Sequence, residues 1–288
     1  MEHSNQVAPN TRREVFKTPS LNQTFFDDGF VVIKNLASNE SICELHNIFQ
    51  SLNFDGDSDS FCVSHWKTSL DQNAIHESVV SVLLPEINKY LLNYKPVLGT
   101  YAVKPGRGVQ KSRMGIHQDW SFVDEHLYSA VSVWVALKDV PESHGCMEFF
   151  PGSQRIFTNV RGQNIKPPIE YLHKEMDESF IKVPVEKGDA IILDSRIVHR
   201  SGINFSNNVR VAAMVAAIPI EAQVMAYARK DLDPQGSVRA YPCHEDFYPN
   251  YDIAKPLDAE DFTWLFDDNL VGSKELAVSR FGHLLASR

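Results

Sequence analysis

The sequence predicts a mostly β fold, a sandwich or barrel with flanking helices, organised as a single domain. Several short β-rich runs follow one another between Gly, Pro, Asn and Asp residues, and such spacing is typical of these architectures. The runs read VLGTYAVKP, SAVSVWVALKDV, GCMEFFPGS, FIKVPVEKGDAIILD and VRVAAMVAAIP. The chain has 288 residues and 43% hydrophobic content, which is enough for one sizeable core.

The part of the chain before these strands is predicted to form a helical layer over residues 20–96. The segment LNQTFFDDGFVVI indicates a short helix, a break at Gly29 and a strand over 30–33. In SNESICELHNIFQSL the apolar residues recur at helical spacing, and Ser38 is a suitable N-cap. HESVVSVLLPEINKYLLNY indicates a second helix, or a helix pair, bent near Pro85. Residues 1–19 are expected to be a loose arm.

The β core is predicted over residues 97–220, and residues 158–180 interrupt it. This insertion is long for a plain connection, and we expect it to act as a lid or binding loop. Residues 221–288 form a C-terminal extension rich in Tyr, Pro and Asp. It ends in SKELAVSRFGHLLASR, an amphipathic helix that would pack on its own core or on a second subunit. The protein is therefore expected to be a monomer or a homodimer.

Composition argues against several classes of partner. The net charge is −9 and no Lys/Arg run occurs, so binding to nucleic acid or a membrane surface is disfavoured. The four cysteines form no CxxC pair, which disfavours a zinc knuckle or a redox dithiol and fits a reducing compartment. No apolar signal core or membrane-spanning run is present. We expect a cytoplasmic protein that acts on a small molecule.

The stretch GIHQDW carries the first candidate metal ligands, His117 and Asp119. Three His-x-acid pairs occur, at 117/119, 173/175 and 244/246, so the spacing alone is weak. Residues two apart point to the same side of a strand but to nearly opposite sides of a helix. The pair at 173 lies in a helical or loop-like segment, and two prolines flank the pair at 244. Only His117 and Asp119 lie where strands are expected.

His199 is the candidate third ligand. It follows the apolar strand of VEKGDAIILDSRIVHRSG, far enough along the chain for several strands to intervene. Two histidines and one carboxylate on one face of a metal form the facial triad of non-haem Fe(II) oxygenases, which leaves coordination positions open. The alternative is that His199 is a strand-end residue bonded to the backbone.

Arg210 supports the metal hypothesis. Alternation in NNVRVAAMVAAIP places Arg210 on one face with Ala212, Met214 and Ala216. Burying an arginine in so apolar a strand is costly unless an anion pairs with it, and its planar fork suits a carboxylate. The alternative is a guanidinium that reaches solvent. Ser201 shares the face of His199 and could offer a hydroxyl to the same carboxylate.

Taken together, these motifs resemble the phytanoyl-CoA dioxygenase (PhyH) family of Fe(II)- and 2-oxoglutarate-dependent oxygenases. HQDW, VWVALKDVPESHGCMEFFPGSQ, KGDAIILDSRIVHRSGIN and RVAAMVA resemble family signatures in the right order, over roughly residues 20–220. The resemblance implies a double-stranded β-helix, or jelly roll. Relatives commonly read PGSH where this chain reads PGSQ, and we assign no metal role to Gln154.

The resemblance also implies roles for particular residues. His117, Asp119 and His199 would be the iron ligands, and Arg210 and Ser201 would hold the distal carboxylate of 2-oxoglutarate. Three further residues match positions near the cosubstrate: Trp134, Lys67 and Thr100. From the sequence alone, Trp134 reads equally as a core aromatic, and Lys67 as an exposed lysine.

The implied cofactors are Fe(II), 2-oxoglutarate and O2. The family couples conversion of 2-oxoglutarate to succinate and CO2 with oxidation of a C–H bond. In related halogenases a small residue replaces the carboxylate, so Asp119 favours hydroxylation, or desaturation or ring formation. Aromatic and cationic residues near the metal motifs are the candidate substrate contacts: Trp120, Phe122, Tyr128, Arg155 and Arg161.

Two other hypotheses remain open. A zinc-dependent hydrolase or isomerase on a jelly roll can also use two histidines and a carboxylate, but it has no need for Arg210. A non-catalytic jelly-roll binding module would keep the fold without turnover. No dense basic patch for nucleotide phosphates is present, so an acyl-CoA is not indicated, and a small metabolite is at least as well supported.

Overall fold

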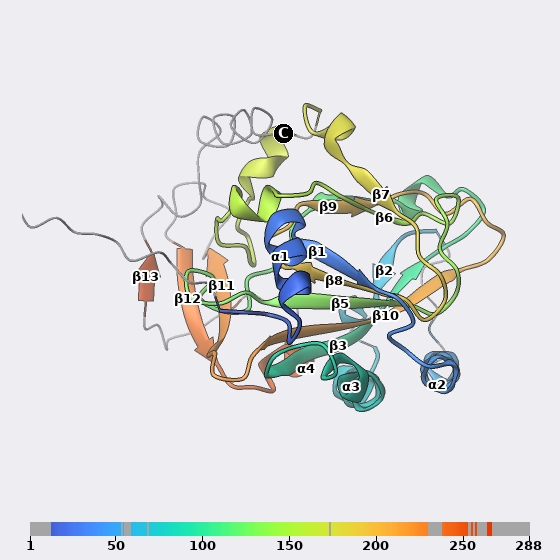
Figure 1. Cartoon of the computed structure of the whole chain (residues 1–288), viewed down its shortest axis with the longest axis horizontal. Helices are drawn as coiled ribbons and strands as arrows, with labels where there is room; N and C mark the ends of the chain where they lie inside the picture. Colours follow the sequence, from blue (N-terminus) through green and yellow to red (C-terminus); the bar gives the residue numbers. More distant parts are fainter. Residues whose placement is uncertain are drawn as a thin grey trace, which may run out of the picture.

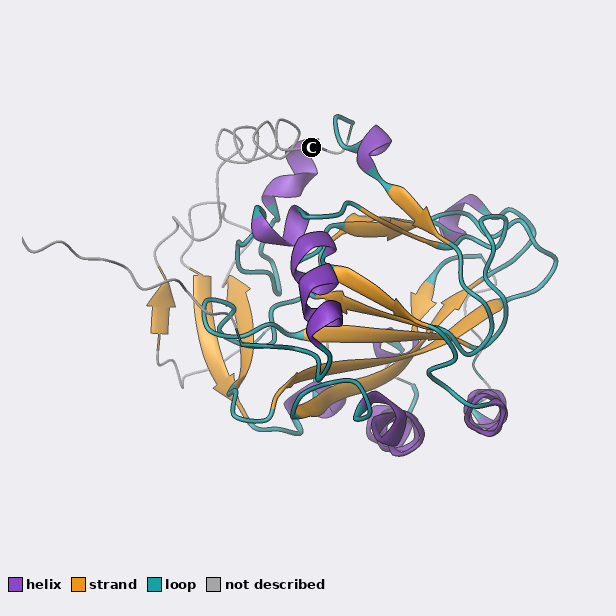
Figure 2. Cartoon of the chain, in the orientation of Figure 1, coloured by secondary structure: helices purple, strands orange, loops and turns teal. Residues whose placement is uncertain are grey.

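The fold is that of a computed structural model, drawn in Figures 1 and 2. The structure describes residues 13–52, 54, 59–67, 69–172, 174–229, 238–252, 255, 257 and 264–266. No helix in these ranges combines the length and the apolar character needed to cross a bilayer.

The larger of two facing sheets has six antiparallel strands in the order β1-β8-β5-β10-β3-β2. Their bounds are β1 Phe30–Ile33, β2 Cys62–Val63, β3 Tyr94–Lys104, β5 Val131–Ala136, β8 Ala190–Asp194 and β10 Arg210–Pro219. The central strands β5 and β8 are buried along their whole length, since both faces of this sheet are covered.

The smaller sheet has four strands in the order β4-β9-β6-β7. Their bounds are β4 Met114–His117, β6 Met147–Phe149, β7 Ile181–Val183 and β9 His199–Ser201. In Figure 1 this sheet lies above the larger one, and from β3 to β10 the chain passes back and forth between the two sheets, with β6 and β7 as a consecutive pair in the smaller one. This arrangement confirms the predicted jelly roll with flanking helices. The space between the sheets is where the candidate site forms.

Helices α1 Pro19–Asp28, α2 Asn39–Ser51 and α3 Gln72–Ile87 precede the main strands, and α2 and α3 cover the outer face of the larger sheet (Figure 2). Alternation along β10 explains the division of its two faces. Val211, Ala213 and Val215 pack in the core beneath these helices, whereas Arg210, Met214 and Ala216 face the interior of the jelly roll. The predicted alternation of this strand is confirmed.

Local signals fix the ends of the first two helices as predicted. Gly29 ends α1 in the left-handed region, at φ 86°, which glycine adopts without cost. Ser38 caps α2 by accepting a hydrogen bond from the backbone N–H of Ser41 at 3.1 Å.

The prediction for the third helix was partly wrong. Asp71 caps α3 by accepting a hydrogen bond from the N–H of Ala74, so the helix starts earlier than the apolar pattern indicated. Pro85 lies inside the last turn, and the helix ends at Ile87 rather than continuing to Tyr94. A missing N–H so close to the end removes one hydrogen bond without dividing the helix into a pair.

The N-terminal arm is shorter than expected, because residues 13–18 pack against the domain. Phe16 is completely buried, forms a β-bridge with Leu91 and contacts Phe25 edge to face at 5.4 Å. Arg13 pairs with Glu221. One buried phenylalanine anchors a segment whose composition looked polar. Residues 1–12 lie outside the described part.

The insertion at 158–180 packs against the rest of the fold. It contains the 3-10 helices η4 Pro168–Leu172 and η5 Asp177–Ser179. Ile169, Leu172 and Met176 are buried in one cluster with Phe157 and Val198. None of the described residues of the insertion lines the interior cavity. A lid-like role for this insertion stays a prediction.

The C-terminal extension forms a separate three-stranded sheet and a short helix. Its bounds are β11 Val224–Arg229, β12 Val238–Cys243, β13 Trp264–Phe266 and α4 Phe247–Asn250. Remaining 3-10 turns are η1 Ser64–Trp66, η2 Gln110–Ser112 and η3 Ser153–Arg155. The amphipathic helix predicted at the end of the chain lies outside the described residues.

Candidate metal and cosubstrate site

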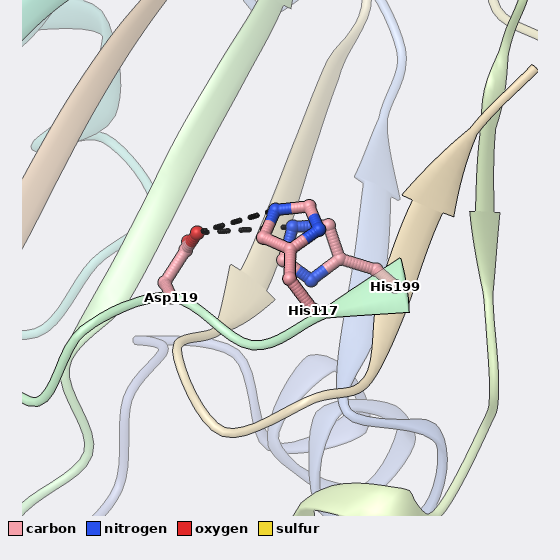
Figure 3. A group of neighbouring side chains, drawn as sticks. All are labelled: His117, Asp119 and His199. Atoms are coloured by element: carbon pink, nitrogen blue, oxygen red, sulfur yellow. Dashed lines mark ion pairs between the residues drawn. The ribbon is translucent and has the colours of Figure 1, made fainter. Parts of the chain in front are cut away.

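Three side chains converge between the two sheets: His117, Asp119 and His199 (Figure 3). His117 ends β4 and His199 begins β9, and the two residues are direct partners in the antiparallel register. Asp119 follows just beyond the end of β4. Its Oδ1 lies 4.0 Å from His117 Nε2 and 3.8 Å from His199 Nε2. Both distances are below twice a metal–ligand bond of about 2.1 Å, so one ion can reach all three atoms.

Backbone contacts aim both imidazoles at the centre. His117 Nδ1 lies 2.8 Å from the carbonyl oxygen of Gly115, and His199 Nδ1 lies 3.0 Å from that of Ile197. These contacts leave each Nε2 free to face Asp119, as metal-binding histidines require. Burial, together with the neighbouring His199, lowers the pKa of His117 to about 4. A neutral imidazole at physiological pH is the form that binds metal.

Ser132 orients the carboxylate and was missed by the sequence analysis. Its hydroxyl donates a hydrogen bond of 2.6 Å to Oδ2 of Asp119. Ser132 lies on β5, opposite Ala216 of β10, and is almost completely buried. Ser132 shares the interior face of β5 with Trp134 and Ala136, whereas Val131, Val133 and Val135 face the helices. A serine within the apolar run AVSVWVAL was the only sequence signal for it.

Arg210 projects into the same cavity from the first position of β10. It is 5% exposed, and its Nη1 donates to the carbonyl of Gly145 at 2.6 Å, while its Nε is buried without a partner. Its guanidinium lies 5.2 Å from the ring centre of Trp134. Among the described residues Arg210 makes no ion pair. Burial lowers its pKa to about 10, so it stays charged at neutral pH.

This arginine is the test of whether the residues fit 2-oxoglutarate. Burying a cation with an unbonded N–H group costs free energy unless an anion pairs with the charge and accepts the hydrogen bond. A carboxylate in the cavity would supply both the charge and the acceptor. Ser201, Trp134 and Thr100 also line the cavity, as the resemblance implied. The donor set of two imidazoles and one carboxylate likewise fits Fe(II).

The cavity measures about 410 Å³ and holds the metal triad and Arg210 together. Lys67, the fourth cosubstrate residue of the prediction, is half-buried at the end of η1 and is not among the residues that line it. Thr100 lines the cavity, but its hydroxyl is already bonded to Ser64 Oγ at 2.7 Å. Direct binding of 2-oxoglutarate by Lys67 or Thr100 stays a prediction.

Of the five candidate substrate contacts, the structure brings two to the cavity, Trp120 and Phe122. Tyr128 packs at the edge of a neighbouring apolar cluster. Arg155 is exposed, with its guanidinium 5.6 Å from the ring centre of Phe26.

Arg161 has a different part in the site from the predicted one. It is buried, and it binds Glu125 through two hydrogen bonds of 2.5 and 2.7 Å. Its Nε donates to the backbone carbonyl of Asp119 at 2.8 Å. Arg161 therefore holds the main chain of a candidate metal ligand, and it is not among the residues that line the cavity.

The unusual glutamine of PGSQ lies away from the metal triad. Gln154 is buried and donates to the carbonyl of Phe26 at 2.9 Å, at the end of α1. A Cβ on Gly29 would meet its Oε1 at 2.5 Å. Gln154 thus packs beneath the turn between α1 and β1, consistent with the decision to assign it no metal role.

Comparisons with known proteins agree with this geometry. The family model described as phytanoyl-CoA dioxygenase (PhyH) matches residues 25–212. The chain is 34% identical over 101 residues to phytanoyl-CoA dioxygenase domain-containing protein 1 of Danio rerio, which covers 32% of this chain and 34% of that protein. It is 30% identical over 103 residues to a phytanoyl-CoA dioxygenase of Arabidopsis thaliana, covering 33% and 35%. The matched segments thus span about a third of these curated relatives.

Two solved structures share the fold at low sequence identity. The non-haem α-ketoglutarate-dependent carbocyclase SnoK from nogalamycin biosynthesis has a TM-score of 0.53 and 19% identity, over 72% of this chain and 86% of that one. HygX from Streptomyces hygroscopicus, solved with nickel, 2-oxoglutarate and hygromycin B, has a TM-score of 0.52 and 14% identity, over 71% and 88%. With the family model covering well over half of the residues, the chain belongs to the phytanoyl-CoA dioxygenase (PhyH) family of 2-oxoglutarate-dependent oxygenases.

Proposed function

We propose that the protein is a non-haem Fe(II)- and 2-oxoglutarate-dependent dioxygenase that hydroxylates an unactivated C–H bond of a small-molecule metabolite. The observation that carries the proposal is Arg210. A buried guanidinium with an unpartnered Nε opens into the same cavity as a 2-His-1-carboxylate triad. Neither group alone is specific, but their combination matches a metal with a keto-diacid cosubstrate.

Each residue then has a defined part. His117, Asp119 and His199 would hold Fe(II), and Arg210 with Ser201 would bind the distal carboxylate of 2-oxoglutarate. Trp134 lies against the guanidinium and limits where the carboxylate can sit. The apolar walls exclude water, which strengthens each of these polar contacts.

When bound, iron, 2-oxoglutarate and O2 would supply an oxidant strong enough to remove hydrogen from an unactivated carbon, with release of succinate and CO2. The chain itself positions the reacting carbon and shields it. Asp119 is present, so the coordination position that halogenases free for a halide is filled. This supports hydroxylation, although ring formation or desaturation would use the same residues.

A zinc-dependent hydrolase or isomerase is the second candidate. The triad could hold Zn²⁺ equally well, because two histidines and one carboxylate suit that ion too. Arg210 counts against it, since hydrolysis or isomerisation at zinc does not require a buried arginine beside the metal.

Metal reconstitution separates these candidates. The metal-free protein would be loaded with Fe(II) or Zn(II), supplied with 2-oxoglutarate and O2, and assayed for succinate against a metabolite library. We expect succinate from the iron form alone, and none from Asp119→Ala. The matched control is Asp246→Ala, which removes the carboxylate of the exposed His244–Asp246 pair and should not change the rate.

Two outcomes would contradict the proposal. Succinate formation by Asp119→Ala at the wild-type rate would exclude Asp119 as a ligand. Anaerobic addition of Fe(II) and 2-oxoglutarate to the folded protein should produce a weak visible charge-transfer band. Its absence would favour a jelly-roll binding module without turnover.

A further inference from the structure

The cavity has two chemically different ends, as the register of β10 shows. Arg210 lies at one end of this strand, opposite Lys104 of β3, and Ala216 lies six residues further along, opposite Leu98. At about 3.3 Å per residue the two positions are roughly 20 Å apart. The Arg210 end carries the charge for a cosubstrate. The Ala216 end is bounded by Leu98, Trp120 and Phe122, which belong to the apolar cluster of Ala216.

The loop over residues 61–67 forms a wall of the cavity between these two ends, with Phe61 beside Lys104 and His65 beside Thr100. The loop is held in place by a buried pair of hydroxyls, because Ser64 Oγ lies 2.7 Å from Thr100 Oγ1. Ser64 Oγ also accepts from the N–H of Tyr101 at 3.0 Å, and Thr100 Oγ1 accepts from the N–H of His65 at 3.3 Å. Gln72 fastens the loop from outside by donating to the carbonyls of Ser64 and Lys67. The loop therefore presents a fixed surface to the cavity.

His65 is the polar group on that surface. It lines the cavity, is 8% exposed, and its Nδ1 is buried without a hydrogen-bond partner. Burial lowers the pKa of His65, with the charge of Asp252 acting in the opposite direction, so the ring is neutral at neutral pH. A buried ring nitrogen without a partner costs free energy, and nearly all such groups in folded proteins are bonded. A ligand in the cavity is the partner that the fold leaves room for.

The surroundings of His65 define which ligand fits. Phe61 and Trp66 contact each other edge to face at 5.9 Å, and Trp66 remains 42% exposed at the rim. Trp120 and Phe122 face the same space from the segment after β4, and such aromatic surfaces favour stacking with a flat ring.

Charge at this site argues against an anionic substrate. The cationic side chains that line the cavity are Arg200 and Arg210. Arg200 is already paired with Glu148 and Asp177, and Arg210 is the group proposed to hold the cosubstrate. Neither is available for a phosphate or carboxylate beside His65.

From these observations we propose that His65 is the polar anchor of the substrate, and that the substrate is an uncharged ring compound carrying a hydroxyl or carbonyl group. The ring packs against the aromatic side chains that line the cavity, and its oxygen bonds to His65 Nδ1. This inference rests on the proposed function and names the substrate class of that same site. A volume of about 410 Å³, shared with 2-oxoglutarate, accommodates a compound of a few fused rings rather than a polymer.

A pair of probes that differ by one hydroxyl tests the proposal. The full chain would be loaded with Ni(II) and 2-oxoglutarate, which prevents turnover, and the binding of 2-naphthol and naphthalene would be measured by equilibrium dialysis. We expect 2-naphthol to bind about 3- to 10-fold more tightly than naphthalene, because one hydrogen bond contributes a difference in affinity of about that size. His65→Leu should abolish this preference while retaining naphthalene. His65→Gln, which keeps a hydrogen-bonding group, should restore part of it.

His126→Leu is the matched control, because His126 is exposed and does not line the cavity. It should keep the wild-type preference. Equal binding of the two probes by the wild type, a preference retained in His65→Leu, or no binding of either probe would overturn the assignment. Folding of each variant is checked by its thermal unfolding.

The result stays separable from the proposed function. If the iron form yields no succinate with any substrate but prefers 2-naphthol through His65, the oxygenase proposal fails and the ring subsite stands. If succinate forms and the preference is absent, the reverse holds.

Discussion

The hydroxyl of Ser132 donates a 2.6 Å hydrogen bond to Oδ2 of Asp119, and Oδ1 of the same carboxylate faces both metal-site imidazoles. Oδ2 is therefore held by a residue of the larger sheet, while Oδ1 stays available to a metal ion. Asp119 lies just beyond the end of β4, and this hydrogen bond attaches its carboxylate to Ser132 of the central strand β5.

Ser132→Ala should weaken metal binding without unfolding the protein. Loss of a group that orients a metal ligand typically costs about 10- to 100-fold in affinity. The change would be measured as the dissociation constant for Fe(II) or Ni(II) under anaerobic conditions. Ser78→Ala on α3, whose hydroxyl bonds only within its own helix, is the control. Unchanged affinity in Ser132→Ala would mean that Asp119 is held by other contacts.

Arg210→Met should raise the KM for 2-oxoglutarate by about 100-fold, because it removes a charge-assisted, two-pronged contact to a carboxylate. Metal affinity should not change, which separates this effect from damage to the triad. Arg210→Lys should lose most of the same affinity, since an ammonium cannot reproduce the planar fork. Steady-state kinetics over a range of 2-oxoglutarate concentrations would measure both variants, and an unchanged KM in Arg210→Met would contradict the assignment.

Lys104 makes the stability of the protein depend on pH. It is completely buried beside Arg210, and burial lowers its pKa to about 6, with the Arg210 charge acting in the same direction. The unfolded chain keeps a pKa near 10.5. Between these two values the unfolded state binds more protons, so the free energy of unfolding rises with pH. The penalty for burying Lys104 is full below about pH 6 and absent above about pH 10.5.

Lys104→Met should remove this dependence. From pH 6.5 to 8.5 the wild type should gain up to about 2.5 kcal/mol relative to the variant, at about 1.4 kcal/mol per pH unit. Urea unfolding of both proteins at the two pH values gives the difference. Parallel pH profiles would show that Lys104 stays protonated, held by its bonds to the carbonyls of Ser112 and Gly202.

Arg161→Met should destabilise the protein by about 3–5 kcal/mol, because it leaves Glu125 buried and unpaired. The double variant Arg161→Met with Glu125→Leu should recover part of this loss, since no isolated charge remains. Chemical denaturation of the two variants measures the difference. A double variant as unstable as Arg161→Met alone would indicate that the bond from Arg161 to the Asp119 carbonyl accounts for the loss.

Features encoded by short-range patterns could be predicted from the sequence. The Ser38 cap, the Gly29 break and the alternation along β10 each depend on a few neighbouring residues, and the structure has all three. The candidate metal residues could be proposed because a motif places His117 and Asp119 two apart, and the structure brings them together with His199. Asp119 nonetheless lies just past the end of β4 rather than on the strand, and its position depends on Ser132 and Arg161.

Features created by long-range contacts could not be predicted. His65 sits in a 3-10 turn with no periodic signal, and it reaches the cavity only because Ser64 bonds to Thr100. Lys104 looked like an ordinary residue at the end of a strand. Arg161 resembled a substrate contact because its partner, Glu125, is distant in sequence. In each case the deciding contact joins segments that the sequence keeps apart.

The pairing of His117 with His199 has a consequence for how the protein matures. Strand β9 lies far along the chain from β4, and β1 likewise pairs with β8. Pairings between strands far apart in sequence form slowly, because the chain loses the entropy of closing a long loop before any stabilising contact forms. On a ribosome, an emerging polypeptide would therefore expose His117 and Asp119 well before His199 exists. Iron would be captured after synthesis has passed both strands, so loading follows folding rather than guiding it.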